Sequence, residues 1–139
     1  MTVSRTPISD HMRRLTYSVE ESMTLLKARE VMERFKIRHL PVLRSGKLVG
    51  LLSDRDIKGE GTWIGTKLDL VDVGRVMQHD IYKVSGDTPL SQVVFEMAER
   101  KLGCAIVVNH KDEVQGIFTS VDAMRLLSQL QAEEDIKST

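Results

Sequence analysis

The sequence predicts an α+β protein of the α/β type, in which two similar β-α-β-β-α units pack sheet to sheet around a pseudo-twofold axis. Three observations lead to this fold class. The chain has 139 residues, about the length of one ordinary domain. Its first half aligns with its second half, and the apolar residues in each half follow strand and helix spacings. One unit is too small for a secure core, whereas two packed units bury both apolar faces.

The repeat places Met12 opposite Met77, an offset of 65 residues. The offset becomes 66 beyond residue 108, because loop 109–112 is one residue longer than loop 44–46. Further matched pairs are Val19 with Val84, Leu25 with Leu90, Met32 with Met97, Ile37 with Leu102, Gly50 with Gly116, Ser53 with Thr119, and Asp56 with Asp122.

In the first unit we expect a strand over residues 15–19 and a helix over 25–35, where apolar residues recur at helical spacing. Strands 39–43 and 47–52 then form a hairpin, because Ser45-Gly46 supplies a tight turn.

In the second unit Thr88-Pro89 predicts a helix start, with a capping hydroxyl followed by proline at the first helical position. This helix runs to about residue 101. Strands follow over 104–108 and 113–118, and a closing helix covers 120–135.

A segment between the units contains three glycines within seven residues. We therefore divide the chain into repeat 1 (1–58), a linker (59–71) and repeat 2 (72–139), which together form one structural domain. The linker holds Trp63 and Ile64, which we expect to dock on the body.

Composition excludes several classes of protein. Twenty Lys and Arg balance twenty Asp and Glu, and only 4% of residues are aromatic, so nucleic acid is not a favoured partner. The apolar runs are too short for a membrane span, and the chain does not start like a signal peptide. One cysteine, Cys104, cannot form an internal disulfide. We expect a soluble cytoplasmic protein without a membrane partner.

The most informative motif is Gly-x-x-Ser/Thr-x-x-Asp, at the end of each hairpin. It comprises Gly50, Ser53 and Asp56 in the first unit and Gly116, Thr119 and Asp122 in the second. One interpretation is a capping box, in which the hydroxyl and the carboxylate satisfy free amides at a helix start. The other is a ribose site, because the motif recurs in register and its glycine leaves room for a ligand. A carboxylate there can accept from the 2′- and 3′-hydroxyls, and the helix N-terminus attracts phosphate.

Segments 37–42 and 47–57, echoed by 104–108 and 116–122, resemble a tandem cystathionine-β-synthase (CBS) domain pair, or Bateman module. Met12 and Met77, each before a strand, match the same pattern. The resemblance covers nearly the whole chain.

The resemblance implies clefts between the repeats that bind AMP, ADP, ATP, S-adenosylmethionine or NAD. It implies that Asp56 and Asp122 hold ribose hydroxyls, with Ser53 and Thr119 facing ribose or phosphate. Its implied base-enclosing groups are Thr16, Tyr17, Ile81, Tyr82, Ile37 and Leu102, and its implied phosphate contacts are Arg38 and His39.

The second unit differs at the implied phosphate positions. It has Gly103 and Cys104 opposite Arg38 and His39, and Val121 opposite Arg55. We therefore expect the first cleft, where Arg55 adds a charge, to bind polyphosphate better. His39 is equally well interpreted as a packed core residue.

The resulting hypothesis is a ligand-sensing regulatory module that is not an enzyme, with the nucleotide as regulatory ligand, no cofactor and an unknown regulated protein as partner. We expect a homodimer built from the helices. The two helices carry more apolar residues than packing on one sheet face requires, including Leu26, Val94 and Phe95, and a dimer contact would bury them. The alternatives are a ligand-free structural dimerisation module and a small enzyme. The four histidines lack the spacing of a metal site, and Cys104 is expected to be a buried structural residue.

Overall fold

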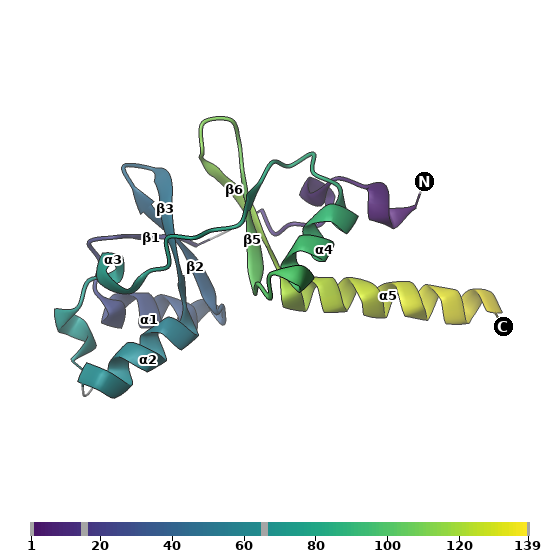
Figure 1. Cartoon of the computed structure of the whole chain (residues 1–139). Helices are drawn as coiled ribbons and strands as arrows, with labels where there is room; N and C mark the ends of the chain where they lie inside the picture. Colours follow the sequence, from purple (N-terminus) through teal and green to yellow (C-terminus); the bar gives the residue numbers. More distant parts are fainter. Residues whose placement is uncertain (1, 15–16, 65–66, 139) are drawn as a thin grey trace.

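Two three-stranded sheets of the same topology form the centre of the molecule (Figure 1). The computed structural model describes residues 2–14, 17–64 and 67–138, and the side chains of all of these except 60–64 and 138. The strands are β1 (Val19–Glu20), β2 (His39–Arg44), β3 (Lys47–Ser53), β4 (Lys83–Val84), β5 (Cys104–Val108) and β6 (Val114–Thr119). In each sheet the first strand is parallel to the second, and the second is antiparallel to the third. The predicted α+β fold of two repeated units is confirmed.

The helices follow the same repeat. They are α1 (Leu25–Phe35), α2 (Asp54–Ile64), α3 (Val73–Val76), α4 (Leu90–Glu99) and α5 (Ser120–Ser138), with 3-10 turns η1 (Val3–Arg5), η2 (Ile8–Asp10) and η3 (Leu68–Leu70). Helix α1 begins where the Thr24 hydroxyl accepts a hydrogen bond from the Lys27 N–H at 3.2 Å. It ends at Lys36, which adopts the left-handed conformation at φ 55°. Lys101 has the same φ beyond α4, so the second unit repeats this ending.

The expected start of α4 is wrong by one residue. Pro89 is the N-cap residue with extended backbone, and Leu90 is the first helical residue. Thr88 makes no capping bond, because the Leu90 N–H donates instead to the Thr6 carbonyl at 2.8 Å. A segment distant in sequence therefore satisfies the free amide of this helix.

The segment expected to be a linker is partly helical. Helix α2 continues through Gly59 to Ile64, and η3 follows after the undescribed residues 65–66. Glycine weakens a helix without preventing it, so the glycine count alone overstated the break. The side chains of Trp63 and Ile64 lie outside the described part of the structure, as does the expected docking of these residues.

The two sheets pack face to face, and the helices cover their outer faces (Figure 1). Leu48 from the first sheet forms one buried cluster with Cys104, Ile106 and Ile117 from the second. A separate core lies between each sheet and its helices, one including Leu40 and the other Phe118. The predicted sheet-to-sheet arrangement is confirmed.

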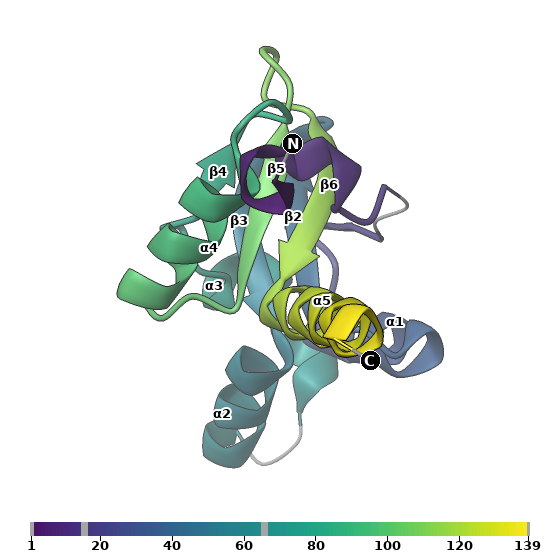
Figure 2. The same ribbon diagram turned by 90° about the vertical axis from the view of Figure 1, so that its right-hand side faces the viewer.

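The leading segment of each half packs on the opposite half. The N-terminal turns lie across β5 and β6 (Figure 2), where the Ile8 N–H donates to the Thr88 carbonyl at 2.8 Å. Reciprocally, α3 lies on the first half, where the Val73 N–H donates to the Met23 carbonyl at 2.8 Å. Ile8 and Val73 are both fully buried. Neither half completes its core without the segment from the other.

A methionine in each exchanged segment explains the glycine of each motif. A Cβ on Gly50 would lie 2.8 Å from Met77 Cγ, and one on Gly116 would lie 2.8 Å from Met12 Cγ. The expectation that these glycines leave room for a ligand is wrong, because a methionine side chain fills the space.

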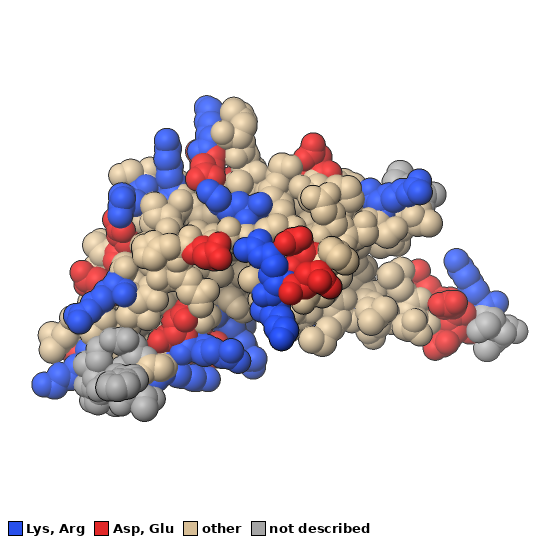
Figure 3. Space-filling view, in the orientation of Figure 1, with Lys and Arg blue, Asp and Glu red and all other residues tan. Residues whose placement is uncertain are grey.

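Charge and hydropathy give two further findings. Basic and acidic side chains are interspersed over the face in Figure 3, in agreement with the balanced formal charge. Within residues 2–14, 17–64 and 67–138, every helix is too short or too polar to cross a bilayer.

We predict that Gly116→Ala lowers the free energy of unfolding by about 1–3 kcal/mol, since overpacking strains a tight core. Gly50→Ala should lower the free energy of unfolding by less. Its added Cβ would lie 3.2 Å from the Gln78 carbonyl oxygen, whereas a Cβ on Gly116 would lie 2.8 Å from the Arg13 carbonyl oxygen. Gly59→Ala is the control: it has open space in α2 and should stabilise the helix by about 0.5–1 kcal/mol. Urea denaturation measures all three, and equal values for Gly116→Ala and Gly59→Ala would contradict the packing argument.

Candidate functional site

The first motif joins the end of β3 to the start of α2. The Ser53 N–H donates to Asp56 Oδ2 at 2.9 Å, and the Asp56 N–H donates to Ser53 Oγ at 3.1 Å. These reciprocal bonds form a capping box, which confirms that interpretation. Asp56 Oδ1 accepts a further bond from Gln78 Nε2 at 3.2 Å.

The second motif has the same backbone bonds and a different outer partner. The Thr119 N–H and Oγ1–H both donate to Asp122 Oδ2 at 2.9 Å, and the Asp122 N–H donates to Thr119 Oγ1 at 3.2 Å. Arg13 then forms an ion pair with Asp122 Oδ1, with Nε at 3.0 Å and Nη2 at 2.9 Å. Sequence reasoning missed both Arg13 and Gln78. They occupy equivalent positions next to Met12 and Met77, so the repeat contained the signal.

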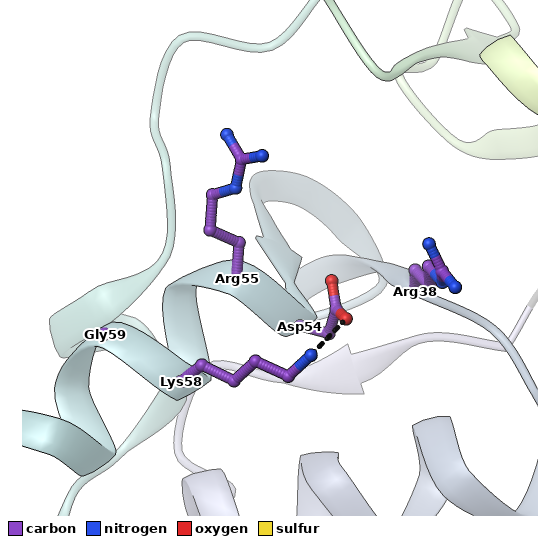
Figure 4. A pocket seen from close by; sticks show the side chains of 5 residues that line it. All are labelled: Arg38, Asp54, Arg55, Lys58 and Gly59. Atoms are coloured by element: carbon purple, nitrogen blue, oxygen red, sulfur yellow. Dashed lines mark hydrogen bonds and ion pairs between the residues drawn. The ribbon is translucent and has the colours of Figure 1, made fainter.

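A cavity of about 460 Å³ lies beside the first motif (Figure 4). It is lined by Arg38, Asp54, Arg55, Lys58 and Gly59. Arg38, an expected phosphate contact, and Arg55, expected to add a charge to the first cleft, therefore lie on the same cavity. Figure 4 shows them on opposite sides of Asp54, which pairs with Lys58 at 3.3 Å. The spacing of Asp54 and Lys58, four residues apart on a helix, was the signal that could have found this pair.

A second cavity of about 520 Å³ shares Arg38, Asp54 and Lys58 with the first. It extends between α1 and α2, and its lining includes Ile37 and Ile57. An apolar wall therefore adjoins the cationic lining on the side of the first motif. This combination can accept a ligand with one apolar and one anionic part.

His39 is held against the second repeat. A Cβ on Gly103 would lie 2.9 Å from His39 Nε2, so glycine at that position lets the ring approach. Burial lowers the pKa of His39 below its ordinary value of 6.5, because desolvation penalises the charged form. Asp54 and Asp56 oppose this shift, and Arg38 adds to it. The environment favours the packed neutral ring over a cationic phosphate contact.

The residues expected to enclose a base are spread over several parts of the molecule. Thr16 lies outside the described residues. Tyr17 stacks on Phe35 with ring centroids 3.8 Å apart, and Ile37 lines the second cavity. The remaining three divide between the sheet interface, which includes Ile81, and the second core, against which Tyr82 and Leu102 pack. Of this set, Ile37 is brought next to the cationic cavity.

Cys104 is buried in the sheet interface, as expected for a structural cysteine. Burial raises the pKa of its thiol to about 12. The thiol is therefore protonated at neutral pH, which disfavours its use as a nucleophile. Among the described residues, no group of three or more His, Cys, Asp or Glu side chains is arranged to hold a metal ion.

Comparison with known proteins identifies both repeats. The model of the CBS domain matches residues 8–60 and 73–129, which bears out the resemblance seen in the sequence. A candidate acetoin utilization protein (AcuB) from Vibrio cholerae superposes with a TM-score of 0.85 and 26% identity, over 94% of this chain and 98% of that one. The CBS domain pair of protein MJ0100, solved with 5′-methylthioadenosine and S-adenosyl-L-methionine, gives 0.80 and 24%, over 89% and 97%.

Two curated relatives are longer than this chain. Homoserine O-acetyltransferase from Methanococcoides burtonii is 26% identical over 126 residues, which cover 90% of this chain and 25% of the relative. The uncharacterized protein MJ1232 from Methanocaldococcus jannaschii is 24% identical over 81% of this chain and 36% of its own length. The chain thus spans about a quarter to a third of these relatives.

We predict that His39 makes stability depend on pH. Its pKa is lowered on folding, so the unfolded state binds more protons between the two pKa values. The stabilisation is present above about pH 6.5 and is lost as the pH falls through the lowered value. Urea denaturation at about pH 7.5 and about pH 5 should show a smaller acid loss for His39→Gln than for the wild type. His110→Gln, at an exposed loop residue, should follow the wild type, and equal pH profiles for all three proteins would contradict the prediction.

Proposed function

The chain belongs to the CBS domain family, and we propose that it is a regulatory module that binds an adenosine-containing ligand beside the first motif. The observation that carries this proposal is that Asp56 lies in the first turn of α2, between Arg55 and Lys58, which line a cavity with Arg38 although Asp56 is not part of that lining. A carboxylate there can accept from ribose hydroxyls, while the cations and the helix N-terminus favour phosphate. The output passes to a partner protein, whose activity the bound ligand biases.

Several features support an adenosine ligand over a purely anionic one. The capping box uses Asp56 Oδ2, so Oδ1 faces the outside of the motif and accepts only the Gln78 amide among the described residues. The apolar wall at Ile37 and Ile57 suits a base or another apolar group. A CBS domain pair of the same fold has been solved with two adenosine-containing ligands.

A second proposed function is dimerisation through the helices, and exposed apolar side chains favour it. Phe95 on α4 is 63% exposed, and Val121, Met124 and Leu127 on α5 are 47%, 66% and 59% exposed. Leu26 and Val94, which the sequence also offered for this contact, pack against the cores of their own halves. An isologous contact between two copies would remove the remaining apolar side chains from water.

The ligand-binding proposal predicts that Asp56→Ala weakens AMP binding by about ten- to a hundredfold, since a hydrogen bond to a charged group contributes roughly 1.5–3 kcal/mol. Calorimetry measures the affinity. The 2′,3′-dideoxy analogue of AMP should lose a similar factor against the wild type and little against Asp56→Ala, because it lacks the hydroxyls that Asp56 accepts from. Absence of binding by AMP, ADP, ATP, S-adenosylmethionine and NAD to the wild type would refute the proposal.

The dimer proposal predicts a molar mass of twice 15.7 kDa by light scattering at micromolar concentration. Phe95→Glu should return the mass to that of one chain, because it places a charge in the apolar contact. Leu70→Glu is the matched control: Leu70 is 71% exposed and lies on η3, away from α4 and α5, so its dimer should persist. A wild-type mass of one chain at every concentration would rule the dimer out.

A further inference from the structure

The two motif carboxylates occupy equivalent places and receive different partners. Arg13 and Gln78 stand directly after Met12 and Met77 in the exchanged segments. Each is anchored by two backbone bonds, Arg13 to Ile117 at 2.9 and 3.1 Å, and Gln78 to Leu51 at 2.8 and 2.9 Å. The two side chains therefore start from matching positions, and each reaches Oδ1 of the motif aspartate on the opposite half.

The hydrogen bonds accepted by each carboxylate differ in number. A carboxylate has about four lone-pair sites, two on each oxygen. Asp122 accepts three hydrogen bonds, two from Thr119 on Oδ2 and one from Arg13 Nε on Oδ1, and Arg13 Nη2 adds an ion-pair contact to Oδ1. Asp56 accepts two from the described residues, one from Ser53 on Oδ2 and one from Gln78 on Oδ1. The described residues therefore occupy Asp122 more fully than Asp56, and a cation holds Oδ1 of Asp122, whereas Asp56 retains sites for ligand hydroxyls.

The occupant of Asp122 is also the harder one to replace. Arg13 is a cation on a carboxylate whose side chain is only 11% exposed, and such charge-assisted paired bonds are stronger than bonds from a neutral group. A ribose hydroxyl is neutral, so at Asp122 it must displace a guanidinium. At Asp56 it competes at most with one neutral amide.

We propose that Arg13 is an intramolecular occupant that closes the second motif to ribose, so that the chain binds adenosine-containing ligands at Asp56 alone. This inference rests on the proposed function of the first motif and specifies which of the two sites performs it. The side chain at position 13 or 78, delivered by the opposite half, then determines whether each site is open.

Exchanging the two side chains tests the proposal. Wild-type protein titrated with AMP, and in parallel with uncharged adenosine, should bind about one ligand per chain. Arg13→Gln should bind a second ligand, with an affinity at the second site about tenfold above that of the wild type, because the guanidinium no longer occupies Asp122 Oδ1. Adding Asp122→Asn to Arg13→Gln should remove the gain. Gln78→Arg should weaken binding at the first site by about tenfold, because a guanidinium would then occupy Asp56 Oδ1 as Arg13 occupies Asp122 Oδ1.

Arg14→Gln is the matched control, since it removes the same charge from the next residue and should behave as the wild type. Two sites of equal affinity in the wild type would overturn the proposal. Weaker binding by Arg13→Gln would also overturn it and would indicate that Arg13 contacts the ligand. If Arg13→Gln does not fold by circular dichroism, unchanged affinity in Gln78→Arg overturns the proposal by itself. Failure of the proposed function gives a different result, in which neither probe binds the wild type or any variant.

Discussion

The exchange of leading segments between the halves is the constraint on which the rest of the structure depends. Met12 packs against Gly116 and Met77 against Gly50, and each contact is so close that a Cβ on the glycine would collide with it. The same segments supply Ile8 and Val73 to the opposite cores. Each half is therefore completed by the other, and each motif aspartate contacts a side chain from the opposite half. Both candidate sites are composite, so the relative position of the halves is part of their geometry.

The two halves share a backbone and differ in a few coupled side chains. His39 needs the absence of a side chain at Gly103, although Gly103 is the counterpart of Arg38 and not of His39. The His39 ring of the first half is thus accommodated by a glycine of the second. The described cavities with cationic walls adjoin the first motif, where Arg38 and Arg55 stand, whereas the second half has Gly103 and Val121 at the matching positions.

Apolar spacing predicted the hairpins and the helices well, because it reports local structure. The strand expected over 15–19 overlaps β1 (Val19–Glu20) at Val19 alone, and residues 15–16 lie outside the described part of the chain. The internal repeat could not predict the exchange, since a repeat shows which segments are equivalent and not which copy they pack against. Three errors share this cause: the motif glycines contact methionine instead of ligand, Thr88 loses its capping role to the carbonyl of Thr6, and Arg13 escaped notice as a partner of Asp122. The division of the chain into two repeats at residues 58 and 72 stays a prediction. Backbone hydrogen bonds between the halves cross this division in both directions.

Capping and ligand binding at the motif are compatible, because they use different oxygens of one carboxylate. Oδ2 is held by the backbone N–H of Ser53 or Thr119, which orients the side chain before any ligand arrives and lowers the entropy cost of binding. Oδ1 is instead held by a residue from the opposite half. A ligand hydroxyl that binds Asp56 Oδ1 beside Gln78 leaves the Gln78–Asp56 bond between the halves in place. A hydroxyl that displaces Arg13 from Asp122 Oδ1 breaks the corresponding contact between the halves. In the proposed function, occupancy of the two sites would therefore have different effects on the connection between the halves, and a single open site gives the bound state one defined structural consequence.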